Sequence, residues 1–113
     1  RFSMNESETI EEEVYHFGET TFCYNNNELR TRSSRVLITS RQADILRLLA
    51  KNIGNVVSKE MIQEAVWGTV SYANSQAVNV QMTYLRHALQ HDATVKIESL
   101  KKKGYVLSVI SPE

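Results

Sequence analysis

Residues 73–90, ANSQAVNVQMTYLRHALQ, decide which fold this chain is expected to adopt. Their apolar side chains recur at i, i+4, i+7 and i+11, which is the spacing of a half-buried helix. These side chains are Val78, Met82, Leu85 and Leu89. Asn74 or Ser75 is expected to cap the start of the helix by accepting a free backbone N–H. The stretch therefore predicts one long helix with a single buried stripe.

The other face of this helix is polar and contains no carboxylate. Its members are Gln76, Asn79, Val80, Thr83, Tyr84 and His87. Amide, hydroxyl and phenol groups suit contacts with base edges and phosphates in DNA. The same pattern also fits a solvated face on a packed helix, so the helix alone does not decide between the two interpretations.

The charge of the chain sums to zero but is unevenly distributed. The first 28 residues hold Arg1 against seven glutamates, a net charge of −6, and residues 29–113 carry +6. An acidic head followed by a basic body indicates that the body faces something anionic.

Length and composition favour one globular domain, because the chain has 113 residues of which 42% are apolar. No apolar run approaches the roughly 18 residues needed to cross a bilayer, so no membrane contact is expected from this segment itself. The chain opens on Arg1 without a leader, which indicates an excised segment. Its single cysteine, Cys23, cannot form an internal disulfide and is expected to be a small strand residue in a reducing compartment.

Residues 1–12 are polar and glutamate-rich, and are expected to be a flexible tail or linker remnant before a domain at 13–110. Aromatic and β-branched residues then predict an antiparallel meander of three or four strands. The expected strands are 13–19, 20–25, 28–30 and 36–38, with turns at 25–27 and 31–35.

Two shorter helices are expected between the meander and the long helix. Thr39 and Gln42 form a capping box, and Gly54 stands where such a helix ends. Ser58 is a second N-cap, before a short helix that ends near Trp67 and holds Met61, Ile62, Ala65 and Val66 on one face. Residues Gly68 to Ala73 are expected to form a loop.

Two strands, 95–98 and 105–110, follow the long helix and are joined by a basic turn that contains Lys101, Lys102 and Lys103. The predicted fold class is therefore α+β: a winged helix-turn-helix with an N-terminal meander, three helices and a C-terminal hairpin wing. In such a fold the third helix enters a major groove. Adjacent lysines repel one another, and a wing that faces phosphates accounts for their accumulation.

Several short motifs occur in an order that resembles the winged-helix domains of OmpR/PhoB-type regulators. They are Ile38-Thr39, Ile45-Leu46, Leu48-Leu49, Gly54–Lys59, Met61-Ile62, Val66-Trp67, Leu85-Arg86 and Lys103–Tyr105. The resemblance covers about residues 13–110. The lysine wing resembles more closely the ToxR/CadC-like branch, whose members are tethered to the inner membrane.

The resemblance implies a sequence-specific DNA-binding domain of a bacterial transcriptional regulator, on the cytoplasmic side of the inner membrane. A transmembrane segment and a sensor domain would then follow Glu113. It also implies that Arg86, with His87 nearby, lies at the DNA backbone, and that the loop Gly68 to Ala73 touches RNA polymerase or a neighbouring subunit. Because the long helix has few cations, binding is expected to depend on a homodimer or a partner regulator.

The helix face also predicts which bases are read. Asn and Gln pair bidentately with adenine, while Val and Thr methyl groups fit the thymine methyl. Gln76, Asn79, Val80 and Thr83 supply these groups, so a half-site dominated by A·T pairs is expected. Tyr84 is expected on a base or on phosphate.

No catalytic constellation or Gly-rich phosphate loop stands out, so neither an enzyme nor a cofactor is predicted. His87 and His91 have metal-compatible spacing beside Asp92, but a third ligand is not evident and no metal site is predicted. The alternative to DNA binding is a winged-helix module that docks a partner regulator or RNA polymerase without binding DNA.

Overall fold

The computed structural model describes residues 13–110, and the predicted tail at 1–12 lies outside the described residues. The chain begins with an antiparallel sheet whose strands lie side by side in chain order. The strands are β2 (Val14–Phe17), β3 (Thr20–Cys23), β4 (Glu28–Arg30) and β5 (Arg35–Leu37), with a 3-10 turn at Tyr24–Asn26. Three helices follow, α1 (Ser40–Ala50), α2 (Lys59–Trp67) and α3 (Tyr72–Ala88), and then a hairpin of β6 (Val95–Leu100) and β7 (Gly104–Val109).

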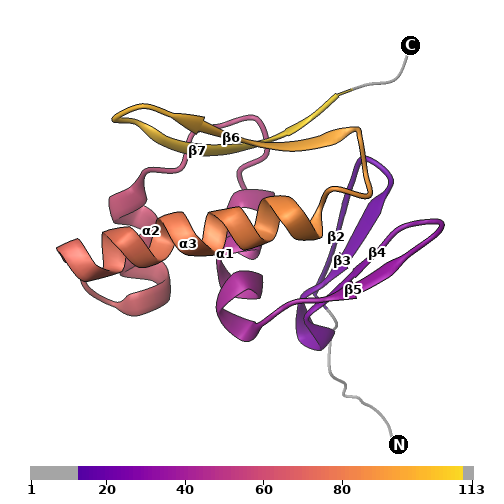
Figure 1. The fold of residues 1–113 in the computed structure, drawn as a ribbon, viewed down its shortest axis with the longest axis horizontal. Helices are drawn as coiled ribbons and strands as arrows, with labels where there is room; N and C mark the ends of the chain where they lie inside the picture. Colours follow the sequence, from indigo (N-terminus) through magenta and orange to yellow (C-terminus); the bar gives the residue numbers. More distant parts are fainter. Residues whose placement is uncertain (1–12, 111–113) are drawn as a thin grey trace, which may run out of the picture.

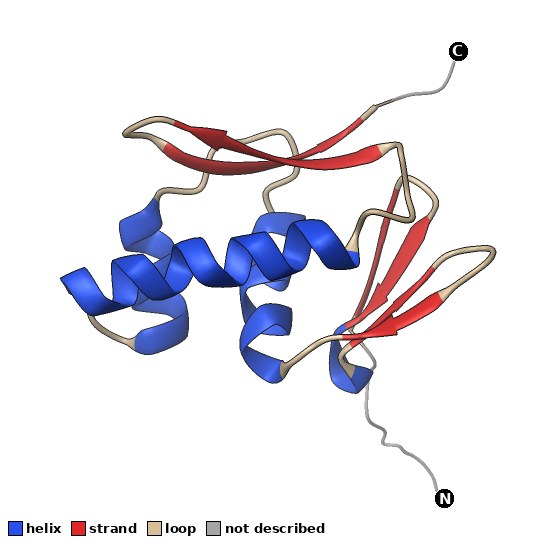
Figure 2. Ribbon diagram, viewed as in Figure 1, coloured by secondary structure: helices blue, strands red, loops and turns tan. Residues whose placement is uncertain are grey.

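The long helix α3 runs across the molecule and organises the other elements around it (Figures 1 and 2). The N-terminal sheet stands near the C-terminal end of α3, and the β6–β7 hairpin runs along one side of the helix (Figure 1). Helix α3 packs on both α1 and α2 and also contacts β6. The predicted α+β fold class, with meander, three helices and hairpin, is confirmed.

The predicted buried stripe of α3 forms the centre of the core. Val78, Met82 and Leu85 are fully buried, and Leu89 is nearly so. They join apolar side chains from every other part of the described fold, among them Phe22, Leu46, Leu49, Ile62 and Leu107. The polar face of α3 therefore points away from the core, as its pattern predicted.

Two of the three predicted helix starts are correct. Thr39 accepts from the backbone N–H of Gln42, whose side chain accepts from the backbone N–H of Thr39, so the capping box is complete. Ser58 caps α2 by accepting from the N–H of Met61.

The predicted start of α3 is wrong. Its N-cap is Ser71, which accepts from the N–H of Asn74, so Asn74 lies inside the helix rather than before it. Tyr72 and Ala73 are helical, and the connection after α2 shortens to residues 68–71. Ser71 and Ser75 are both suitable caps, and the sequence alone does not rank them.

The buried face of α2 also differs from the prediction. Ile62 is fully buried, but Met61 and Ala65 are exposed, and Gln63 is buried in their place. The side chain of Gln63 accepts from the N–H of Ser71 and so fixes the entry into α3. A buried amide is tolerated when it is hydrogen-bonded, which the apolar pattern could not reveal.

Candidate nucleic-acid interface

The exposed face of α3 carries all the side chains that were predicted to meet DNA there. Gln76, Asn79, Val80, Thr83, Tyr84, Arg86 and His87 are all exposed. Val80 and Tyr84 expose 48% and 56% of their surface, so their apolar groups are free to contact a partner. The structure thus brings these residues together on one free surface.

Four members of this face already make side-chain hydrogen bonds within the protein, and one of them, His87, pairs with Gln90. The hydroxyl of Thr83 donates to the backbone oxygen of Asn79, one turn earlier, at 3.2 Å. The Nε of Arg86 donates to the carbonyl of Ile97 in β6 at 3.1 Å, and the phenol of Tyr105 in β7 donates to the Oδ1 of Asn79 at 2.8 Å. The last two bonds join α3 to the hairpin, so helix and wing are positioned relative to each other by side chains of the interface.

Lys101, Lys102 and Lys103 form the tip of the hairpin, and all three are exposed. The tight turn requires a left-handed conformation at Lys102, with φ of 65°. Gly104 follows with φ of 140°, and a Cβ there would collide with the backbone of Val57. Only glycine fits this position, because the wing passes so close to the strand residue before α2.

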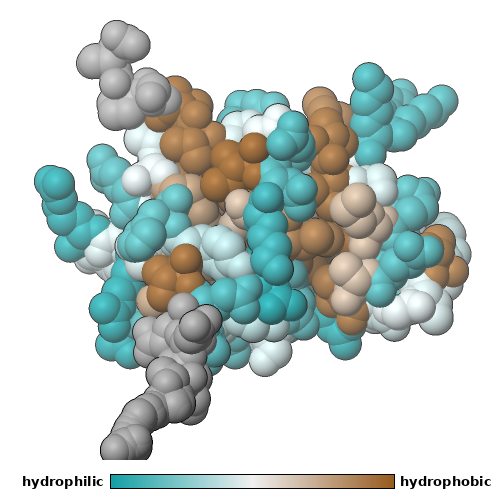
Figure 3. Space-filling view, turned by 180° about the vertical axis from the view of Figure 1, so that it is seen from behind, coloured by the Kyte–Doolittle hydropathy of each residue, from teal (hydrophilic) through white to brown (hydrophobic). Residues whose placement is uncertain are grey.

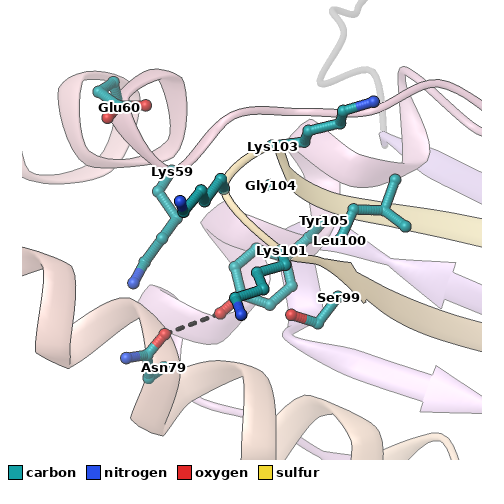
Figure 4. Close-up of a pocket in the computed structure, with 10 residues that line it drawn as sticks. Lys59, Glu60, Asn79, Ser99, Leu100, Lys101, Lys103, Gly104 and Tyr105 are labelled. Carbon is teal, nitrogen blue, oxygen red and sulfur yellow. Dashed lines mark hydrogen bonds between the residues drawn. The ribbon is translucent and has the colours of Figure 1, made fainter.

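A cavity of about 240 Å³ separates the wing from the two helices (Figure 4). Its wall combines the three wing lysines with Lys59, at the start of α2, and with Asn79, Ser99 and Tyr105. Four lysines against the one carboxylate of Glu60, together with the N-terminal end of α2, give this lining a net positive charge, which favours an anion such as a phosphate group.

The phenol of Tyr105 is buried at the base of this cavity. Burial raises the pKa of Tyr105, while the positive charge of Arg86 and a hydrogen bond from Ser99 lower it in part. Tyr105 and Ser99 are opposite each other in the β6–β7 register. The phenol donates to Oδ1 of Asn79 at 2.8 Å.

Lys59, Ser99 and Tyr105 were not among the predicted site residues. Lys59 follows directly after the correctly predicted cap Ser58, so its place at the N-terminus of α2 was visible in the sequence. The positions of Ser99 and Tyr105 were not, because they depend on how the wing packs on α3.

The histidines considered as metal ligands do not converge with Asp92. Asp92 is buried and accepts from Thr20 and Thr94, whereas His87 and His91 are exposed. Within residues 13–110, no three His, Cys, Asp or Glu side chains are grouped as a metal site would require. None of the helices in that range is both long and apolar enough to cross a membrane.

A basic hairpin beside the exposed face of a third helix defines a winged helix-turn-helix protein. Residues 33–107 match the family described as "Transcriptional regulatory protein, C terminal", and the chain belongs to this family. The OmpR/PhoB-type resemblance is thereby confirmed, and the family is one of transcription regulators rather than enzymes.

Individual relatives agree with this assignment. The chain is 26% identical over 103 residues to the transcriptional regulatory protein RprY of Bacteroides fragilis, which covers 91% of this chain and 44% of RprY. It thus spans less than half the length of that relative.

Solved structures of the same fold include the DNA-binding domain of E. coli CadC. That domain has a TM-score of 0.74 at 24% identity, over 88% of this chain and 92% of the other. The DNA-binding domain of Klebsiella pneumoniae RstA, in complex with the RstA box, has a TM-score of 0.72 at 23% identity, over 84% and 96%.

Proposed function

We propose that this chain binds double-stranded DNA sequence-specifically, as the DNA-binding domain of a bacterial transcriptional regulator. The observation that carries the proposal is the continuous surface formed by the acid-free face of α3 and the lysine tip of the wing. A helix of this kind enters the major groove, and a basic hairpin follows the phosphate backbone or the minor groove.

The exposed residues of α3 divide into two roles in this proposal. Gln76, Val80 and Thr83 read base edges, and Tyr84 reaches a base or a phosphate. Arg86 and His87 lie near the DNA backbone at the C-terminal part of the helix. Because the hydroxyl proton of Thr83 is used within the helix, Thr83 contributes its methyl group and an acceptor.

Selection from a random duplex library tests this proposal directly. Val80 and Thr83 should favour thymine methyl groups, and Gln76 should favour adenine, so A·T pairs should dominate the positions that these residues contact. A mobility shift on random duplex at low salt is the companion measurement. Absence of any binding at high micromolar protein would exclude DNA binding and favour the protein-interaction module.

The connection between α2 and α3 supports a second contact, with RNA polymerase or a neighbouring subunit. Val70 is 50% exposed and Tyr72 is 81% exposed, although both are large and apolar. Exposed apolar side chains also occur in several patches on the face opposite to that of Figure 1 (Figure 3). Replacing Val70 and Tyr72 with Ser should leave DNA affinity unchanged and reduce transcription activation in a reconstituted assay.

The tethered branch of the family remains the finer proposal. Its support is the similarity to the CadC domain and the lysine-rich wing. In a tethered regulator, an apolar segment of about 20 residues would follow Glu113 in the gene, and the domain would lie on the cytoplasmic side. A receiver domain encoded before Arg1, with no such segment, would instead assign the chain to the response regulators.

We also propose that the protein binds DNA as a homodimer or with a partner regulator. Sedimentation of the protein–DNA complex would count the copies of the protein.

A further inference from the structure

Asn79 is the one residue of the exposed α3 face whose side-chain acceptor is engaged by the wing. Its Oδ1 accepts from the phenol of Tyr105, which is 6% exposed and therefore held in place by the core. Figure 4 shows the Nδ2 of Asn79 pointing away from Tyr105. The side chain consequently offers N–H donors to the outside while its oxygen faces the protein.

The surroundings of the phenol fix this orientation of the amide. Tyr105 is buried, so the surrounding core leaves its phenol little freedom to move. The phenol donates its proton to Oδ1 of Asn79 at 2.8 Å, and an amide N–H could not accept that proton. Rotating the amide by 180° would take this acceptor away from the phenol proton, and the hydroxyl would have to turn and accept from Nδ2 instead.

An amide fixed in this way reads bases differently from a free one. A free Asn pairs with adenine by accepting from N6 and donating to N7. An Asn that presents only donors matches an edge that presents only acceptors, and guanine with its O6 and N7 is such an edge. We infer that Tyr105 is a positioning residue that makes Asn79 a donor-only reader, so that the contacted position selects guanine over adenine.

This inference rests on the proposed DNA-binding function and replaces the expectation that Asn79 pairs with adenine. It also makes the wing part of sequence recognition, in addition to the phosphate contacts proposed for its lysines. The positions contacted by Gln76, Val80 and Thr83 keep their preference for A·T pairs, so the half-site contains one guanine in an A·T-rich context.

The test compares base preferences of the wild-type protein with those of Asn79→Ala and Tyr105→Phe, by selection from a random duplex library. Asn79→Ala identifies the contacted position, because the preference there is lost. Wild-type protein should prefer guanine over adenine at this position by about tenfold, the equivalent of one good contact. Tyr105→Phe removes only the hydroxyl, frees the amide to rotate, and should reduce this ratio to near one while other positions keep theirs.

Tyr24→Phe is the matched control, because it removes a phenol that donates to Asp44 far from the wing. It should leave every base preference unchanged. The inference is overturned if any base other than guanine is preferred at the Asn79 position, if Asn79→Ala alters no position, or if Tyr105→Phe leaves the guanine preference intact. Each of these outcomes can be observed only if the protein selects a consensus sequence. Such a consensus supports DNA binding even when the inference about Tyr105 fails. A wild-type protein that selects no consensus would instead overturn the proposed function itself.

Discussion

Asp92 is a single side chain that joins the N-terminal sheet to the helical part of the fold. It is 3% exposed, and its carboxylate accepts from the N–H of Glu19, the hydroxyl of Thr20, and both the N–H and the hydroxyl of Thr94. Gly18 lies against the same cluster with φ of 61°, and a Cβ there would collide with Thr94. The turn between β2 and β3 is therefore fitted closely around this carboxylate.

Asp92→Asn should destabilise the protein by about 1–3 kcal/mol at neutral pH, because the amide turns one N–H group toward these donors. Thermal or urea unfolding measures the loss. Burial alone would raise the pKa of Asp92, but the hydrogen bonds from Thr20, Thr94 and the backbone outweigh it and hold the pKa below its usual range. A depressed pKa stabilises the fold above the unfolded value of about 3.9, and this contribution is lost as pH falls through the folded value.

The pH dependence supplies the control for this prediction. Stability of the wild-type protein should fall more steeply below about pH 4 than that of Asp92→Asn, since only the carboxylate titrates. Glu64→Gln, an exposed acid on α2, should behave as wild type. Parallel curves for Asp92→Asn and wild type would contradict the role given to this carboxylate.

Asp92 also shows that the contacts of a single side chain cannot all be predicted from the sequence. Along the chain it stands near His87 and His91, and this spacing is compatible with a metal site. One of its partners, Thr94, is two positions away, but Thr20 is 72 positions away, and only the packing of the β2–β3 turn beside Asp92 brings those two together.

At the scale of the element, α3 was predictable because its burial pattern is local. The apolar stripe depends only on the helical period, and each of its four members is buried as predicted. Caps and strand ends were less certain, because several suitable residues compete within three or four positions. The start of α3, the buried face of α2 and the end of α1 were predicted wrongly, and α1 ends at Ala50 rather than at Gly54.

Leu85→Ala tests the contribution of the α3 stripe to stability. Leu85 is fully buried in the core cluster, so its truncation should cost about 2–5 kcal/mol through lost burial and the remaining cavity. Val80→Ala on the same helix, at 48% exposure, should cost well below about 1 kcal/mol. If chemical denaturation showed the same loss of unfolding free energy for both variants, the apolar stripe of α3 would not be the centre of the core.

The wing element is tested by the triple replacement of Lys101, Lys102 and Lys103 with Ala. Binding to all duplexes should weaken alike, and the slope of log K against log salt should flatten by about one unit for each lost phosphate contact. Lys51→Ala, at the end of α1, removes a charge outside the wing and should leave the slope as it is. A shifted base preference with an unchanged slope would mean that the lysines read bases.

For the whole molecule, the fold class was predictable and the relation between its parts was not. The order of meander, helices and hairpin followed from turn residues and periodicity. The bonds from Tyr105 to Asn79 and from Arg86 to the carbonyl of Ile97 join the wing to α3, and no local pattern encodes them. The candidate site could therefore be predicted as a set of exposed residues, but not as a surface in which some of their donors and acceptors are already used.

The distribution of charge over the whole chain gives the last prediction. Residues 1–12 carry Arg1 against four glutamates, so a protein that begins at Glu13 has a net charge of +3 where the full chain has zero. Such a protein keeps all the described residues, including Glu13 with its hydrogen bond from Arg47. Removing acidic residues reduces the repulsion from a DNA duplex, and this repulsion is screened by salt beyond a Debye length of about 10 Å at 0.1 M. The shortened protein should therefore bind random duplex severalfold more tightly at about 0.05 M salt, as measured by fluorescence anisotropy. This difference in affinity should vanish near about 0.3 M salt.

A full-length variant with Glu6, Glu8 and Glu11 replaced by Gln is the control, because it has the same net charge of +3 as the shortened protein. Its affinity should match that of the shortened protein. Equal affinities of all three proteins at low salt would show that the acidic head has no influence on how the basic body meets DNA.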